Sequence, residues 1–214
     1  MTRSDLTHLY FLLDRSGSMQ SIKTDTEGGF SAFVEEQRRA VGECRVTLAQ
    51  FDDQYEIVFA DTPVADVGRL DLQPRGSTAL LDAMGRLITE AGAALAALPE
   101  DQRPGSVVVA IMTDGLENAS REWTHPAVKA LVEQQTTAYQ WQFLYMGADQ
   151  DAIDVGTGLG VGAAHTVSYT RGNVDKVMAA SSAKVSDLRR DRSVDASATM
   201  RGYTAVERRA ASEE

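Results

Sequence analysis

The sequence has a single cysteine, Cys44, so the chain can form no internal disulfide. A chain without disulfides fits a reducing compartment, and we expect a cytoplasmic protein. Cys44 stands in the apolar run 44–51, which predicts a buried thiol that acts as a small hydrophobic group rather than as a nucleophile. The start of the chain lacks the basic, apolar and small-residue order of a signal peptide. No stretch approaches the roughly 18 apolar residues of a membrane span, so no membrane partner is expected.

Positive charge is also scarce. The chain has 21 Lys and Arg against 31 Asp and Glu, which gives a formal net charge of −10. Proteins that bind nucleic acids carry clustered basic residues, so this balance argues against a nucleic-acid partner. The acidity identifies no partner of its own, because most acidic surfaces are simply solvated.

Several enzyme signatures are missing. The sequence contains no G-x-S-x-G pentapeptide for a serine nucleophile and no P-loop for a nucleotide. Its G-x-G-x-x-A stretch, residues 158–163, lies about ten residues beyond the end of the expected strand before it and precedes another strand, so it predicts a loop rather than a dinucleotide site. The three histidines, His8, His125 and His165, stand at the starts of expected elements, where solvated or capping roles are predicted.

What the sequence has is an alternation of strands and helices. Its 214 residues are 43% hydrophobic, enough for the core of one domain. Strands are expected at 9–14, 44–52, 55–61, 106–114, 141–149 and 165–170, and helices at 30–41, 77–98, 125–139, 152–160 and 173–191. This order predicts an α/β fold, a doubly wound, mostly parallel, Rossmann-like sheet with helices on both faces.

Local signals refine this prediction. The second and third strands are separated by only a short polar turn, which predicts a hairpin whose second strand is an antiparallel edge strand. The helix 77–98 is expected to begin with Ser77 or Thr78 as its N-cap. A domain is expected over residues 1–192, followed by a polar, partly disordered tail at 193–214.

Three of the expected strands end in an aspartate: Asp14, Asp114 and Asp149. Parallel strands present their carboxyl ends at one edge of a sheet, where ligands bind at the point of strand reversal. After Asp14 the chain places hydroxyls at Ser16 and Ser18. Such oxygens are ligands for a hard divalent cation such as Mg²⁺, although Asp or Ser at a strand end also caps helices. From this segment alone both interpretations stay open.

Two further segments add to the pattern. The stretch "RGSTALLDA" places Thr78 at a loop-to-helix junction, and "IMTDGLEN" ends a strand in Asp114. With "DRSGSM", these motifs stand in the order found in the von Willebrand factor A domain family, which the chain resembles over about residues 6–190. The stretch "TDGLEN" looks like the bacterial single-domain branch of that family.

The resemblance implies a metal-ion-dependent adhesion site formed by Asp14, Ser16, Ser18, Thr78 and Asp114. In the family the hydroxyls contact Mg²⁺ directly and the aspartates often hold it through water. Mn²⁺ prefers the same oxygen donors. An open coordination position is then completed by a carboxylate of a protein partner.

The resemblance predicts a divalent-cation-dependent protein-binding module that is not an enzyme. An alternative is an adaptor or regulatory subunit of an ATPase or of a stress-resistance system of the tellurium-resistance type. A remote alternative is a metal-dependent phosphotransfer enzyme, which would need an acid where Ser16 stands. Glu117 and Asn118 are expected at the same edge, in capping or recognition roles, and Trp123 as a surface contact or a core residue. The partner and the oligomeric state do not follow from the sequence.

Overall fold

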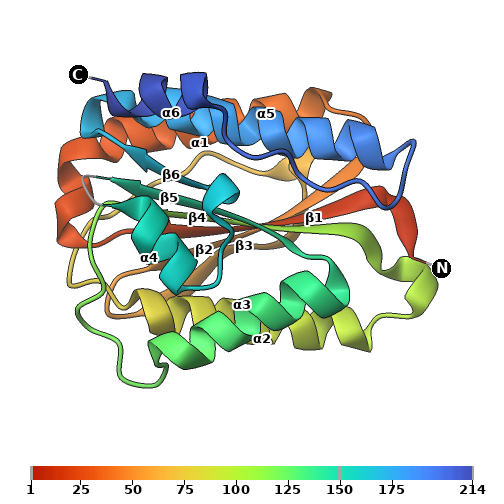
Figure 1. The fold of residues 1–214 in the computed structure, drawn as a ribbon, viewed down its shortest axis with the longest axis horizontal. Helices are drawn as coiled ribbons and strands as arrows, with labels where there is room; N and C mark the ends of the chain where they lie inside the picture. The colour runs from red at the N-terminus through yellow and green to blue at the C-terminus, as the bar shows by residue number, and fades with distance from the viewer. Residues whose placement is uncertain (1, 149–150, 214) are drawn as a thin grey trace.

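The computed structural model describes residues 2–148 and 151–213. One sheet lies between two layers of helices (Figure 1). Its strands are β1 (Arg3–Asp14), β2 (Glu43–Phe51), β3 (Tyr55–Pro63), β4 (Pro104–Thr113), β5 (Gln142–Ala148) and β6 (Thr166–Tyr169). The α-helices are α1 (Lys23–Arg39), α2 (Leu80–Ala97), α3 (His125–Tyr139), α4 (Ala152–Gly158), α5 (Val174–Arg192) and α6 (Ala205–Ser212).

The strand order is β3-β2-β1-β4-β5-β6. All neighbouring strands are parallel except the edge strand β3, which pairs antiparallel with β2. This confirms the predicted doubly wound sheet and its hairpin. The chain builds outward from β1 to one side and then from β4 to the other, so the strand order reverses between β1 and β4. A ligand site is expected at the carboxyl ends of these two strands.

The alternation of side chains along β1 divides the core in two. Leu9, Phe11 and Leu13 face the layer of α1 and α5, whereas Tyr10 and Leu12 face the layer of α2 and α3. Figure 1 shows α1, α5 and α6 over one face of the sheet and α2 and α3 over the other. A strand with helices on both faces is apolar at successive positions, and this is why residues 9–13 form an unbroken apolar run that leads directly to Asp14.

The start of α2 differs from the prediction. The helix begins at Leu80, and its N-cap is Ala79, without a side-chain cap. The first-turn amides are instead satisfied from a distant loop: Leu81 donates to Glu117 Oε2 at 2.9 Å, and Asp82 donates to Ser120 Oγ at 3.1 Å. The N-cap prediction for Ser77 or Thr78 was therefore wrong, because a tertiary contact provides the cap that local sequence usually provides.

His8 also differs from the prediction. It lies within β1, is buried, stacks on Tyr10 with ring centroids 4.1 Å apart, and shares a hydrogen bond of 2.9 Å with Thr47 Oγ1. Burial lowers the pKa of His8 to about 4; the Asp61 carboxylate opposes this shift and the Arg45 guanidinium adds to it. A solvated or capping role is therefore wrong for His8.

The other two histidines lie at the boundaries of helical elements. His125 is the exposed first residue of α3. His165 ends the 3₁₀ turn η4 (Ala163–His165) and shares a hydrogen bond of 2.9 Å with the Met200 carbonyl through Nε2.

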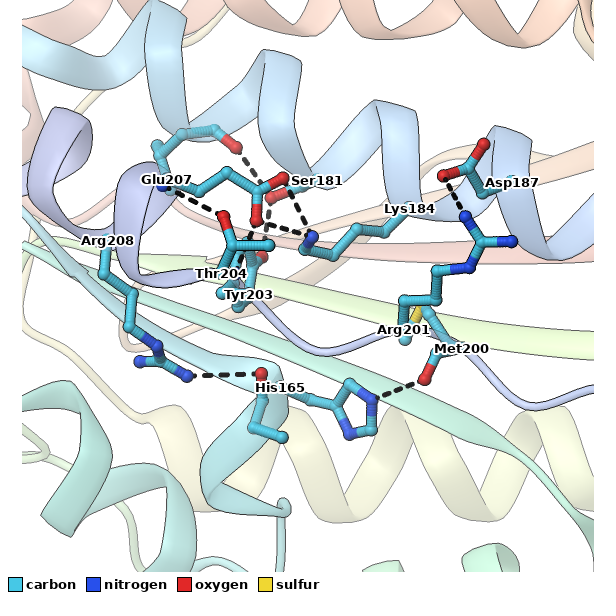
Figure 2. Close-up of polar contacts among 12 residues, drawn as sticks. His165, Ser181, Lys184, Asp187, Met200, Arg201, Tyr203, Thr204, Glu207 and Arg208 are labelled. Atoms are coloured by element: carbon cyan, nitrogen blue, oxygen red, sulfur yellow. Dashed lines mark hydrogen bonds and ion pairs between the residues drawn. The ribbon is translucent and has the colours of Figure 1, made fainter.

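The C-terminal segment is packed against the domain. Although residues 193–213 are polar, they bury Met200, Tyr203 and Ala211. Figure 2 shows the polar contacts that hold this segment on α5 and η4. The frayed tail expected from composition is thus replaced by an ordered helix, because a few apolar side chains in a polar sequence are enough to anchor it. The division of the chain at residue 192 stays a prediction.

The expectations for Cys44 and for the glycine-rich stretch hold. Cys44 is a buried free thiol, and burial raises its pKa to about 11. Residues 159–162 connect α4 to the turn before β6, so most of the stretch 158–163 is a loop, as predicted. Within the described ranges, no helix is both long and apolar enough to cross a membrane.

Candidate metal centre

Asp14 ends β1 at the reversal of strand order, and its side chain is fully buried. Its Oδ1 accepts a hydrogen bond from the Ser16 backbone amide at 2.6 Å, and its Oδ2 accepts one from Thr113 Oγ1 at 2.6 Å. Burial raises the pKa of Asp14 to about 6, and these hydrogen bonds offset only part of the shift. A nearby cation favours the ionised form of such a carboxylate.

Ser16 comes directly before the turn η1 (Gly17–Ile22), and Ser18 lies within this turn. Ser16 is buried and Ser18 is exposed, and their hydroxyl oxygens lie 3.1 Å apart. Ser18 also donates to Asp114 Oδ1 at 2.6 Å. The hydroxyls therefore face the carboxylate that follows β4, 96 residues further along the chain.

Asn118 holds Thr78 in place at the same edge. The Thr78 amide donates to Asn118 Oδ1 at 2.9 Å, and the Asn118 amide donates back to the Thr78 carbonyl at 3.0 Å. Just before Thr78, the loop is tied to the serine turn, because Gly17 donates to the Gly76 carbonyl at 3.3 Å. Asn118 thus has a positioning role, and Glu117 caps α2, which settles their structural roles left open by the sequence.

Gly115 follows Asp114 and leaves space between the oxygens. A Cβ atom at this position would lie 3.0 Å from Thr78 Oγ1 and 3.7 Å from Ser18 Oγ. The Thr78 and Ser18 hydroxyls therefore border the same small space, which a side chain at position 115 would fill. All five predicted ligands, Asp14, Ser16, Ser18, Thr78 and Asp114, come from segments that meet at this edge.

The donor set fits a hard divalent cation. Neighbouring oxygens around an octahedral Mg²⁺ are about 3.0 Å apart, given metal–oxygen distances of about 2.1 Å, and the Ser16 and Ser18 hydroxyl oxygens are 3.1 Å apart. The described part of the chain holds no group of three or more His, Cys, Asp and Glu side chains arranged for a metal. A metal at this edge would rely on hydroxyl oxygens together with two carboxylates.

Two residues of the site were not found from the sequence. Thr113 links β4 to Asp14 through its hydroxyl; it lies inside the recognised "TDG" stretch, which was the available signal. Arg171 belongs to the turn η5 (Arg171–Asn173) after β6, and its Nη2 lies 3.3 Å from Asp114 Oδ2. No spacing in the sequence connects Arg171 to Asp114, because the contact arises from the sheet order.

Two further residues were predicted near the site, Trp123 and Asp149. Trp123 is partly buried against α2, where a Cβ on Gly85 would approach its ring to 2.1 Å, so Trp123 is a core residue. Asp149, predicted at the same edge, lies outside the described residues.

Neither a protein-family model nor a curated protein matches the sequence. Solved structures do match. Proximal thread matrix protein 1 from the mussel byssus, with a zinc-occupied MIDAS motif, has a TM-score of 0.60 and 15% identity over 81% of this chain and 46% of its own. The vWF domain of the type V pilus tip protein Mfa5 from Porphyromonas gingivalis gives 0.58 and 11%, over 84% of this chain and 94% of its own.

A von Willebrand factor type A protein from Catenulispora acidiphila gives a TM-score of 0.54 and 14% identity, over 83% of this chain and 42% of its own. This chain spans less than half of the length of the mussel and Catenulispora proteins. At 11–15% identity the likeness concerns the fold. The chain therefore has the fold of von Willebrand factor A domains.

Proposed function

We propose that the chain is a divalent-cation-dependent protein-binding module. The observation that carries the proposal is the meeting of Ser18 with Asp114 and Ser16, at 2.6 and 3.1 Å, around the space bordered by Thr78. In this proposal the hydroxyls of Ser16, Ser18 and Thr78 hold Mg²⁺ or Mn²⁺. Asp14 and Asp114 provide negative charge, and they hold the ion through water.

The proposed partner is a protein that presents a carboxylate. Neutral hydroxyls donate no charge to the ion, and the two carboxylates only balance a divalent charge, so the ion attracts a further anion. Mg²⁺ commonly retains several waters that a ligand can replace. We further propose a non-enzymatic, cytoplasmic role, as in the bacterial single-domain branch; an adaptor role beside a separate ATPase would use the same surface.

Calorimetric titration with Mg²⁺ tests the metal site. Thr78→Val keeps the size of the side chain and removes the proposed ligand, so we expect it to weaken Mg²⁺ binding by at least about tenfold, or 1.4 kcal/mol. Thr26→Val is the matched control, because Thr26 is equally buried on α1 and its hydroxyl has no hydrogen-bond partner among the described residues. The control should bind Mg²⁺ as the wild type does. A wild type that shows no binding up to tens of millimolar Mg²⁺ refutes the proposal.

Partner binding is tested separately. A captured partner should be released by EDTA, and replacing its contacting carboxylate with the amide should weaken binding by at least about tenfold. Retention that is unchanged in EDTA contradicts the mechanism. Turnover of a phosphate ester with Mg²⁺ that is lost in Thr78→Val would favour the phosphotransfer alternative instead.

A further inference from the structure

Arg171 brings a positive charge to the proposed metal centre from the turn η5, which follows β6. Its Nη2 lies 3.3 Å from Asp114 Oδ2, and its Nη1 donates to Ser21 Oγ at 2.8 Å. Ser21 belongs to η1, the turn that also carries Ser18. The guanidinium therefore spans the site from the carboxylate after β4 to the serine turn after β1.

The backbone that carries Arg171 is held on both sides by the C-terminal segment. The Thr170 amide donates to the Ala211 carbonyl at 2.9 Å. Asn173 Nδ2 donates to the same carbonyl at 3.1 Å and to the Glu213 carbonyl at 2.6 Å. The C-terminal segment is itself fastened by the contacts in Figure 2, so η5 is fixed between two ordered elements. Arg171 thus extends from a well-anchored turn.

The contact with Asp114 matters because the two oxygens of this carboxylate face different groups of the protein. Its Oδ1 accepts from Ser18 and its Oδ2 faces the guanidinium. A divalent cation beside Ser18 and Asp114 would stand close to the Arg171 charge, and like charges at such distances in a partly dry site repel one another appreciably. The Asp114 side chain is fully buried, whereas that of Arg171 is 38% exposed, so the guanidinium is the group that has room to move.

We infer that Arg171 is an internal competitor of the divalent cation at the Asp114 carboxylate and thereby sets the metal affinity of the site. The inference rests on the proposed function. Metal binding draws Asp114 toward the ion and weakens its contact with Arg171. The site then holds its cation less tightly than the same oxygens would hold it without the guanidinium.

The test compares Mg²⁺ affinities by calorimetry at low salt. Arg171→Gln retains amide donors for Asp114 and Ser21 but removes the charge, and the dissociation constant should fall on the order of tenfold. Arg171→Lys keeps the charge and should stay within about twofold of the wild type. Arg190→Gln is the matched control: it removes the same charge from an exposed arginine of α5 that pairs with Asp187, and it should leave the affinity unchanged.

A second readout follows Arg171 itself. In the wild type, Mg²⁺ should shift the NMR signal of the Arg171 Nε–H group, whereas the signal of Arg190 should not move. Unchanged or weaker binding in Arg171→Gln, in a protein whose Thr78→Val variant loses Mg²⁺, overturns the inference and leaves the proposed function intact. Absence of binding in the wild type and in every variant defeats the proposed function, and the inference with it.

Discussion

The carboxyl edge of the sheet and the C-terminal segment use carboxylates in opposite ways. At the C-terminal segment, both oxygens of Glu207 accept hydrogen bonds from Lys184 Nζ, at 2.9 and 2.8 Å (Figure 2). At the carboxyl edge, Asp14 accepts hydrogen bonds from two neutral donors, the Ser16 amide and the Thr113 hydroxyl. The charge of Glu207 is thus balanced by the Lys184 ammonium, whereas these hydrogen bonds hold Asp14 in place without balancing its charge.

This difference separates a structural polar cluster from the proposed metal centre. A paired carboxylate has its pKa lowered: burial raises the pKa of Glu207, but the Lys184 and Thr204 contacts outweigh it. Asp14 shows the reverse, with a pKa raised to about 6 by burial. A fold that buries the Asp14 carboxyl among neutral donors loses stability there, and such losses are usual at functional sites. The predictions below test this contrast by changing one region and measuring both stability and Mg²⁺ binding.

The largest expected effect on stability lies in the C-terminal segment. Tyr203 is buried, its hydroxyl is 2.7 Å from Ser181 Oγ, and the Lys184 ammonium lies 5.0 Å from its ring centroid. Tyr203→Ala should lower the free energy of unfolding by about 4 kcal/mol, because it removes a buried aromatic ring and leaves a cavity. Urea unfolding measures this, and the folded variant should still bind Mg²⁺.

Tyr139, which is 62% exposed, provides the matched control. Tyr139→Ala should cost no more than about 0.5 kcal/mol. A Tyr203→Ala cost as small as that of the control would mean that the C-terminal segment is only loosely attached.

His8 offers a third case, a buried ionisable group that is neither well paired nor placed at the metal centre. Its folded pKa of about 4 lies below the ordinary value of 6.5, so the folded state requires the neutral ring. Stability is therefore lost as pH falls from about 6.5 towards 4, and the loss from this group reaches at most about 3 kcal/mol. The Asp61 carboxylate, 3.7 Å from Nδ1, is exposed and relieves little of it.

The His8→Gln variant isolates this contribution. Unfolding free energies of the wild type and the variant should converge or cross as pH falls from 7 to 4.5, since over this range the unfolded wild type binds a proton at His8 that the folded protein excludes. Asp14 contributes a change of the opposite sign in both proteins, so it cancels in the difference. A difference between the two proteins that stays constant over this range would contradict the buried neutral state of His8.

The same chemical change in the two regions gives the sharpest comparison. Glu207→Gln removes the counter-charge of Lys184, whose side chain is only 5% exposed, and should cost about 2 kcal/mol, between the values for surface and buried pairs. Asp114→Asn retains an acceptor for Ser18 and should cost less than about 1 kcal/mol. Mg²⁺ binding should be lost in Asp114→Asn and kept in Glu207→Gln. Equal costs, or the opposite pattern of Mg²⁺ binding, would show that the two regions do not differ in this way.

The sequence predicted the sheet well because the alternation of apolar strands and amphipathic helices is a local signal. The sequence also allowed the prediction that the segments bearing Asp14, Thr78 and Asp114 lie at one edge of the sheet, because parallel strands end at the same edge. The α2 cap from Glu117 and the Arg171 contact could not be predicted, since each depends on loops that meet only in the folded chain. The ordered C-terminal segment was missed because Tyr203 stands in polar surroundings without helical periodicity.

The smallest expected effect on stability comes from Ser18, the exposed hydroxyl of the proposed ligand set. Ser18→Ala removes a hydrogen bond to Asp114 from the exposed side of that contact, where water can take the place of the hydroxyl, so unfolding should change by no more than about 0.5 kcal/mol. Ser31→Ala, an exposed serine of α1 that donates to the Glu27 carbonyl, is the matched control for stability. If Ser18 is a ligand, only Ser18→Ala should weaken Mg²⁺ binding, by at least about tenfold, or 1.4 kcal/mol. Loss of a hydroxyl with only a structural role would not weaken Mg²⁺ binding strongly while leaving the stability almost unchanged. Unchanged Mg²⁺ affinity in Ser18→Ala would remove Ser18 from the ligand set, even where Thr78→Val abolishes binding.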